Sequence, residues 1–179
     1  MSADVPDVER HWAPARPVSY ALAGFLALLG GIRYGVHAEA LVVMSVIAVL
    51  VVISRHDLER HIIPNRIVVP AWIAVLLAQL VIEPHHRLDW ILGSFGAGAF
   101  FLVVQLAYPA GLGMGDVKLA LLIGAVLGRS VIAALLLGTL AAGVVSAALL
   151  LAHGSDARKR AIPLGPFLAA GAIVVLLFL

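Results

Sequence analysis

The chain has 179 residues, of which 63% are hydrophobic and 12% are charged, and its mean hydropathy is +1.08. Because a soluble domain carries about 45–50% apolar and about 25% charged residues, this composition excludes a soluble globular domain and predicts an integral membrane protein in a lipid bilayer. The net charge of +2 is too small to indicate nucleic-acid binding, and the absence of cysteine excludes disulfides, thiolate zinc sites and cysteine nucleophiles.

The chain begins with a polar segment, residues 1–17, that mixes acidic and basic side chains with prolines. A secretory signal would begin with basic residues without such acids and would end at a small-residue cleavage site. We therefore expect a short cytoplasmic tail, followed by a single transmembrane domain over residues 18–179.

Seven apolar stretches follow the tail, and together they predict an all-α, polytopic membrane helix bundle of about seven spans. They are Val18–Val36, Ala40–Ile53, Ile67–Ile82, Trp90–Tyr108, Val117–Leu127, Val131–Ala152 and Ile162–Leu179. A spanning helix needs about 20 residues to cross a hydrocarbon core of about 30 Å. Ala40–Ile53 and Val117–Leu127 fall well short of this length, so each must recruit flanking polar residues or the bilayer must thin beside it.

The basic residues are unevenly divided between the two ends of these predicted spans. With the N-terminus in the cytoplasm, the tail and inner loops hold Arg10, Arg16, Arg55, Arg60, Arg66, Lys118, Arg158, Lys159 and Arg160, and the outer loops hold only Arg33, Arg87 and Arg129. Since cytoplasmic loops carry the excess of Lys and Arg, this division predicts a cytoplasmic N-terminus. It also places Asp57 and Asp116 at the cytoplasmic face.

Small residues recur four apart in the fifth and sixth stretches, as the pairs Gly124 and Gly128, Gly138 and Ala142, and Gly143 and Ala147. This spacing lets helices approach closely in lipid. We therefore expect these residues to serve helix packing rather than ligand binding.

Asp116 stands at the edge of one short stretch, directly after the alternating glycines Gly111, Gly113 and Gly115. Glycine tolerates positive φ and close backbone approach, so these residues favour a tight, open turn before a helix that starts near Asp116. Irregular backbone at membrane depth survives only where it lines a cavity or is buried in protein. The alternative is a flexible loop with an N-capping aspartate, and the spacing alone does not decide between them.

Asp57 stands at the edge of the other short stretch, seven residues before Pro64 and next to a basic loop. Proline suits a helix start and cannot extend the preceding helix, so Pro64 and Asn65 predict the beginning of the third span. The alternative is an ordinary cytoplasmic loop in which Asp57 joins Arg55 and Arg60 in a solvated ion cluster that contributes little to stability.

The two aspartates say more as a pair than singly. A carboxylate held beside lipid is costly and is a functional candidate by default. Two carboxylates a few ångströms apart do not both ionise readily, so one keeps its proton while the other can take a proton from water. This is the arrangement of an aspartic peptidase. Lys118, close to Asp116, can favour an ionised carboxylate, bind an acidic substrate group, or simply extend to the membrane rim.

A metal site is a weaker interpretation of the same region. Imidazole and carboxylate groups bind zinc or manganese, and His56, Asp57 and His61 lie close together in the sequence. His56 and His61 are five residues apart, however, and would lie on different faces of a continuous helix. We therefore expect neither a metal nor another cofactor.

Over residues 40–179 the chain resembles the bacterial type IV prepilin peptidases, of the GxGD aspartic membrane-protease group. The family's first motif, an aspartate followed after a basic stretch by Ile-Pro-Asn, matches Asp57 and Ile63–Asn65. The second, Gly-x-Gly-Asp followed by x-Lys, matches Gly113–Lys118, and Ile162–Phe167 resembles the start of the family's final helix. Three such motifs in this order on a polytopic chain are specific.

The resemblance implies that Asp57 and Asp116 are a catalytic pair that cleaves the short basic leader from prepilin-like membrane proteins, at the cytoplasmic face of the inner membrane and without a metal. Supporting roles then fall to Gly111, Gly113, Gly115, Lys118, Pro64 and Asn65.

One departure from the family concerns cysteine. Larger members carry an N-terminal loop with paired cysteines, linked to methylation of the new N-terminus, and this chain has no cysteine. It resembles the smaller, peptidase-only members that serve tight-adherence (Flp-type) pili, so methyl transfer and S-adenosylmethionine are not expected. Two alternatives are a small proton-coupled transporter and a non-catalytic pilus-assembly scaffold. A transporter predicts acidic residues near the bilayer midplane and internal repeats, neither of which is visible.

Overall fold

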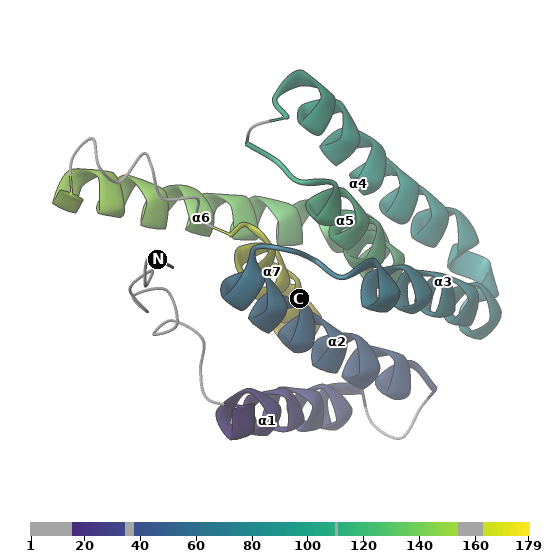
Figure 1. Cartoon of the computed structure of the whole chain (residues 1–179). Helices are drawn as coiled ribbons and strands as arrows, with labels where there is room; N and C mark the ends of the chain where they lie inside the picture. The colour runs from purple at the N-terminus through teal and green to yellow at the C-terminus, as the bar shows by residue number, and fades with distance from the viewer. Residues whose placement is uncertain (1–15, 35–37, 110, 154–162) are drawn as a thin grey trace.

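The structure is a computed structural model that describes residues 16–34, 38–109, 111–153 and 163–179. Within these ranges the chain forms seven α-helices and two short 3-10 helices, without a strand (Figure 1). The α-helices are α1 (Arg16–Tyr34), α2 (Ala38–Arg60), α3 (Asn65–Ile82), α4 (Arg87–Ala107), α5 (Met114–Leu127), α6 (Val131–His153) and α7 (Gly165–Phe178); η2 (Pro84–His86) precedes α4 and η3 (Gly128–Ser130) precedes α6. The all-α prediction is confirmed, because each apolar stretch corresponds to one helix.

Four helical segments among the described residues are long and apolar enough to cross a membrane. They are Ala38–Arg60, Asn65–Ile82, Pro84–Ala107 and Met114–Ala152, the last of which runs from α5 through η3 into α6. Tyr20–Arg33 and Gly165–Phe178 are apolar but shorter. Large apolar side chains also face outward, such as Leu92 on α4 and Leu140 on α6, which are 67% and 64% exposed. The protein is therefore a multi-pass membrane protein.

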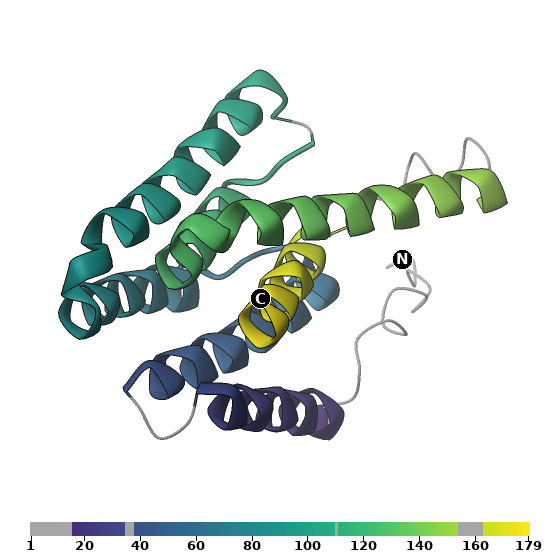
Figure 2. The same ribbon diagram turned by 180° about the vertical axis from the view of Figure 1, so that it is seen from behind.

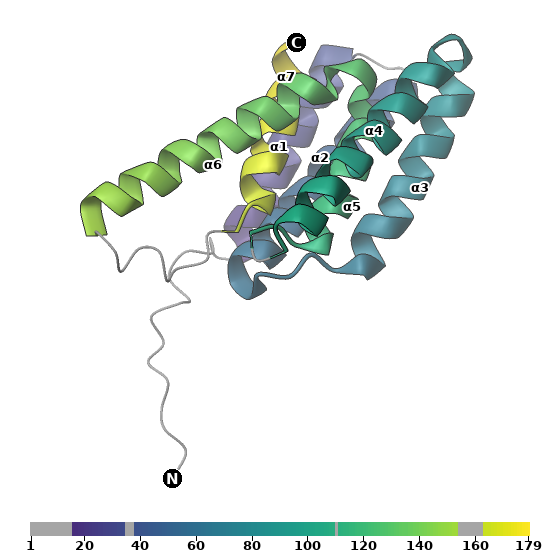
Figure 3. The same cartoon turned by 90° about the horizontal axis from the view of Figure 1, so that it is seen from above.

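Helix α5 lies at the centre of the bundle. It packs against α3 and α4 on one side and against α2 and α7 on the other, while α1 packs on α2 (Figure 3). Leu119, Leu122 and Ile123 of α5 have no exposed surface. Helix α6 packs on α7 and then extends away from the other helices, as Figure 2 also shows from behind.

The two short apolar stretches behave differently in the structure. Helix α2 takes in the polar residues beyond Ile53 and continues to Arg60, so that its 23 residues include Asp57. Helix α5 has only 14 residues, which is about 21 Å at a rise of 1.5 Å per residue. The first stretch therefore recruits its polar flank, as expected, whereas the second remains short. Of the predicted tail over residues 1–17, residues 1–15 lie outside the described residues, and α1 begins at Arg16.

Glycines bring α4 and α5 into close contact. A Cβ atom on Gly124 would collide with the backbone of Gly93, and one on Gly93 would collide with the backbone of Gly128. Gly138 likewise meets the backbone of α7 at Phe167, where a Cβ would lie 2.7 Å from the carbonyl oxygen. The packing prediction is thus confirmed for these pairs. It is wrong for Gly143, where a Cβ would have no atom within 4 Å.

A buried hydrogen-bond chain joins the three helices on this side of the bundle. The Trp72 indole of α3 donates to Ser94 Oγ of α4 at 2.8 Å, and that hydroxyl donates to the Leu121 carbonyl oxygen of α5 at 2.9 Å. Ser94 has no exposed surface. Since a buried polar group is costly unless it is hydrogen-bonded, this chain fixes the relative positions of α3, α4 and α5, on which the site below depends.

Candidate active site

Asp57 lies in the last turn of α2 and is 6% exposed. Its Oδ2 accepts a hydrogen bond of 3.0 Å from the backbone N–H of Gly165, the first residue of α7. The positive end of the α7 dipole therefore points at this carboxylate and offsets its position at the C-terminal end of α2. The next residues turn the chain sharply, because His61 has a φ of +53° and donates its N–H to the Asp57 carbonyl oxygen at 2.8 Å.

Asp116 lies in the first turn of α5. The helix begins at Met114, with Gly113 as its N-cap residue, and Asp116 Oδ2 accepts a 3.1 Å hydrogen bond from the Gly113 N–H. Asp116 is therefore not the N-cap residue itself, but its carboxylate closes the helix start from the third helical position, where the dipole favours a negative charge.

The two aspartates line one pocket of about 310 Å³. They come from segments about 60 residues apart in the chain, and the folding of the bundle brings both to this one pocket. The pocket lies where α2 ends and where α3, α5 and α7 begin, at the lower end of the bundle in Figure 3. Its other lining residues are His61, Ile62, Ile63, Asn65, Gly113, Met114, Gly115 and Lys118.

Among the glycines near Asp116, Gly115 allows a close contact with Ile63, and none has an unusual backbone angle. The expected turn does precede a helix that begins at Met114, but none of Gly111, Gly113 and Gly115 has a positive φ, so the turn does not use that backbone freedom. Gly115 has no side chain because a Cβ there would lie 2.8 Å from Ile63 Cβ, at the floor between α3 and α5. Gly111 does not line the pocket; its N–H donates to the Tyr108 carbonyl oxygen at 3.1 Å.

Lys118 and Asn65 fasten the starts of α5 and α3 to each other. Lys118 Nζ donates a 2.7 Å hydrogen bond to Asn65 Oδ1. Pro64, just before α3, does not line the pocket, but its carbonyl oxygen accepts the backbone N–H groups of Ile67 and Val68 and so begins the helix. The Ile-Pro-Asn segment therefore positions the pocket wall opposite Gly115.

The histidines beside Asp57 do not form a metal cluster. Across the described residues, no group of three or more His, Cys, Asp or Glu side chains is placed to hold a metal ion. His56 Nδ1 lies 3.1 Å from the Val52 carbonyl oxygen of the preceding turn, on the helix itself, whereas His61 lines the pocket. His56 lies on α2, whereas His61 follows the end of that helix at the turn.

The sequence analysis did not predict the positions of two residues of the site, His61 and Gly165. His61 was considered only as a metal ligand, although it lines the pocket next to Asp57. Gly165 was noted only within a motif, although its N–H holds the Asp57 carboxylate, and a Cβ on Gly165 would lie 2.6 Å from Asp57 Oδ2. The Gly165–Pro166 pair signalled a helix start, but nothing local indicated which side chain that start would meet.

The arrangement has the elements of acid–base chemistry. Two carboxylates, each oriented by one backbone N–H, flank a space large enough for a water molecule and a peptide segment. A pair in which one carboxyl group is ionised and the other protonated can accept a proton from water and donate one to a carbonyl oxygen. The fold and the site thus define a polytopic helical membrane protein with a paired-carboxylate pocket.

The chain belongs to the type IV leader peptidase family, whose sequence profile matches residues 44–150. It is 32% identical over 165 residues to a prepilin leader peptidase/N-methyltransferase of Bacillus subtilis (strain 168), covering 90% of this chain and 65% of that protein. It is 31% identical to a protein of the same name from Pseudomonas putida, covering 84% of this chain and 54% of the relative. The leader peptidase HopD of Escherichia coli is 31% identical over 66% of this chain and 81% of its own length.

The chain spans about two thirds or less of the length of the first two relatives. No solved structure matches it significantly. The family match includes both Asp57 and Asp116, and it ends before Gly165. The contact between the start of α7 and Asp57 is therefore known from the structure and not from the family comparison.

Proposed function

We propose that this protein is an aspartic endopeptidase that removes the short basic leader from prepilin-like membrane proteins, with Asp57 and Asp116 as the catalytic pair. The observation that carries the proposal is the convergence of these two distant carboxylates on one pocket at one end of the bundle. The names of the relatives, which are leader peptidases, supply the substrate class. Family membership favours this function over the transporter and scaffold alternatives.

The proposed reaction uses one water molecule and two proton transfers. The ionised aspartate takes a proton from the water, whose oxygen attacks the peptide carbonyl carbon, while the protonated aspartate gives its proton to the carbonyl oxygen. The resulting tetrahedral diol collapses as the C–N bond breaks. The leaving nitrogen then takes a proton from the first aspartate, and the second aspartate recovers its own from the diol. Each carboxylate accepts one backbone hydrogen bond, so this pattern does not assign the acid and the base.

The supporting residues have structural roles in this proposal. Gly113 adds no side chain to the pocket beside Asp116, and Gly115 lets Ile63 pack against the start of α5. Ile62 and Met114, 66% and 46% exposed, border the carboxylates with apolar surface that suits the junction between a leader and an apolar helix. Lys118 holds α3 to α5 through Asn65. No metal or other cofactor enters the proposal, and it assigns peptide hydrolysis without methyl transfer.

The proposed site is the cytoplasmic face of the inner membrane. Arg55, Arg60, Arg66 and Lys118 lie at the helix ends beside the aspartate pocket. The described basic residues of the opposite end are Arg33, Arg87 and Arg129. An excess of basic residues favours the cytoplasmic side, which supports a cytoplasmic N-terminus and one transmembrane peptidase domain over residues 18–179, with residues 1–17 as a cytoplasmic tail.

The test is co-expression of the full chain with a prepilin-like substrate that carries an epitope tag, followed by separation of precursor and product on a gel. Asp57→Asn and Asp116→Asn should each lower the cleavage rate by about three orders of magnitude or more, because removing a member of a catalytic unit disables it. The matched control is Asp89→Asn, which changes an aspartate at the opposite end of the bundle and should cleave at the wild-type rate. All variants must be present in the membrane at equal levels. Cleavage by either pocket variant at the control rate would refute the catalytic pair.

A further inference from the structure

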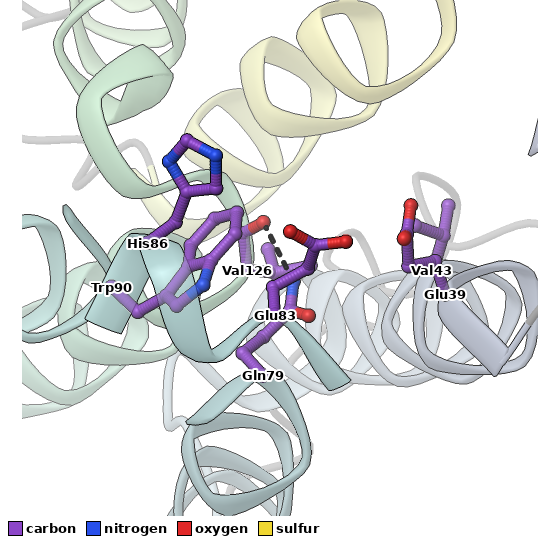
Figure 4. Close-up of a pocket in the computed structure, with 7 residues that line it drawn as sticks. All are labelled: Glu39, Val43, Gln79, Glu83, His86, Trp90 and Val126. Atoms are coloured by element: carbon purple, nitrogen blue, oxygen red, sulfur yellow. Dashed lines mark hydrogen bonds between the residues drawn. The ribbon is translucent and has the colours of Figure 1, made fainter. Parts of the chain in front are cut away.

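A second pocket, of about 350 Å³, lies at the opposite end of the bundle (Figure 4). It is lined by Glu39, Val43, Gln79, Glu83, His86, Trp90 and Val126. Glu39 lies near the start of α2 and Asp57 near its end, so the two pockets are separated by about 27 Å along that helix. This separation is close to the thickness of a hydrocarbon core, which fits a second pocket at the headgroup level of the opposite leaflet.

Two buried polar atoms in this pocket have no hydrogen-bond partner in the described part of the chain: Gln79 Oε1 and Trp90 Nε1. Gln79 is only 5% exposed. Its Nε2 donates a 3.4 Å hydrogen bond to the Val126 carbonyl oxygen, which turns Oε1 toward the space below Glu83 (Figure 4). A buried donor or acceptor without a partner costs about 1–3 kcal/mol. The pocket therefore calls for a ligand that donates to Gln79 and accepts from Trp90.

The charge of Glu83 indicates that the hydrogen-bond donor of the ligand is a cation. Glu83 is the C-cap residue of α3, where the negative end of the helix dipole disfavours an anion. Its carboxylate has no hydrogen-bond or ion-pair partner among the described residues and points into the space between Gln79 and Glu39 in Figure 4. A cation bound here would relieve Glu83 as well as Gln79. The described residues hold no group of three or more His, Cys, Asp or Glu side chains that could hold a metal ion, which favours an organic cation over a bare metal ion.

The acceptor side of the ligand is specified by Trp90, whose N–H has no acceptor among the described residues. Arg87 and Arg129 are exposed at the same end of the bundle but do not line the pocket. Arg87 uses its Nε on the Leu80 carbonyl oxygen and Arg129 uses its Nε on Asp89. Since each guanidinium has five N–H donors, both retain donors for an anionic group such as a phosphate.

We propose that this pocket binds an ethanolamine phosphate group, whose primary ammonium donates to Gln79 Oε1 and Glu83 and whose phosphate accepts from Trp90. In a membrane protein the abundant source of this group is the headgroup of phosphatidylethanolamine, and the soluble source is free phosphoethanolamine. A quaternary ammonium cannot replace it, because it has no N–H to donate. The inference concerns lipid binding and is independent of the proposed peptidase reaction.

The test is native mass spectrometry of the full-length protein in detergent with equal amounts of phosphatidylethanolamine and phosphatidylcholine. Wild-type protein should retain the ethanolamine lipid about tenfold more than the choline lipid, the difference expected from a charged hydrogen bond. Glu83→Gln and Gln79→Leu should abolish this preference. The matched control is Glu59→Gln, which removes an acidic group on α2 at the other end of the bundle, where Glu59 pairs with Arg55, and should leave the preference unchanged.

The outcomes distinguish the two sources of the group. Displacement of bound lipid by millimolar phosphoethanolamine, together with protection against thermal unfolding, assigns the site to the soluble compound, whereas retention of lipid assigns it to the bilayer. Equal retention of the two lipids by wild-type protein, or an unchanged preference in Glu83→Gln, would overturn the proposal and leave a pocket filled by water alone. Glu83→Gln changes a half-buried surface residue, so the test stands even where Gln79→Leu fails to fold.

Discussion

The two ends of the bundle treat buried polar groups in opposite ways. At the aspartate end, α3, α5 and α7 all begin, and backbone N–H groups of Gly113 and Gly165 each hold one carboxylate. At the other end α3 and α5 finish, and Gln79 Oε1 and Trp90 Nε1 have no partner among the described residues. Helix direction explains part of this difference, because the starts of α5 and α7 place backbone N–H donors against the two aspartates, whereas Gln79 Oε1 belongs to the last turn of α3, which has no free N–H. At the aspartate end the protein's own backbone binds the carboxylates, whereas at the other end the proposed ligand would supply the missing hydrogen-bond partners.

Among variants expected to affect the aspartate end of the bundle and not the other end, Gly165→Ala should have the largest effect. The added Cβ would lie 2.6 Å from Asp57 Oδ2, so the carboxylate or the start of α7 must move. A displacement near 1 Å at a reacting group costs about 100-fold in rate. Prepilin cleavage should fall by about that factor, while lipid retention at the far pocket stays at the wild-type level.

Gly143→Ala is the control for this variant, because its Cβ would have no neighbour within 4 Å on α6. A rate for Gly165→Ala close to that of Gly143→Ala would show that Asp57 does not need its present position against α7.

A smaller effect is expected from Gly93→Ala, one turn after Trp90 on α4. Its Cβ would meet the backbone of Gly128, which cannot move aside as a flexible side chain can. Overpacking of this kind costs about 1–3 kcal/mol. The free energy of unfolding in mixed micelles should fall by that amount, and the preference for the ethanolamine lipid should weaken because Trp90 shifts.

Gly96→Ala is the matched control, since it lies three residues further on the same helix and its Cβ would touch nothing within 4 Å. Equal stability of the two variants would show that the contact between α4 and α5 is looser than the structure indicates.

The smallest effect should come from the hydrogen bond between Lys118 and Asn65 at the aspartate end. Lys118→Met and Asn65→Ala should each lower the free energy of unfolding by about 1 kcal/mol. The double variant should cost less than the sum, with a coupling energy of about 0.5 kcal/mol or more. Strict additivity of the two changes would show that the bond does not connect α3 to α5 in the membrane.

Much of the architecture follows from the apolar pattern alone. Each of the seven stretches forms a helix because an apolar run of this length in lipid must satisfy its backbone internally. The pattern left open whether Ala40–Ile53 would recruit its polar flank or the bilayer would thin, and it could not show that the polar end of α2 is stabilised by tertiary contacts such as that of Asp57 with Gly165. Nor could it show that α5 and α6 form one apolar segment joined by a single short turn.

The sequence predicted several residues of the candidate site, but not the contacts between distant segments that bring them together. The two motifs pointed to Asp57, Asp116, Asn65 and Lys118, all of which line the pocket. The glycines were interpreted through backbone freedom and close approach, but the sequence could not show that the neighbour of Gly115 is Ile63, a residue about 50 positions away. Contacts between distant segments depend on how the helices pack, and a single sequence gives no direct sign of them. The second pocket could not be predicted either, since Gln79 and Trp90 belong to no motif and meet only through helix packing.

The junction between α5 and α6 has a mechanical consequence. Only the three residues of η3 separate the two helices, and Gly128 there has a φ of +54°. No slack loop is available at this point, so any change in the tilt of α6, whose far part extends away from the bundle (Figure 3), must be absorbed at Gly128 or passed into α5. Asp116 stands at the far end of α5. A change in the tilt of α6 that is not absorbed at Gly128 would therefore reach the first turn of α5, which carries Asp116.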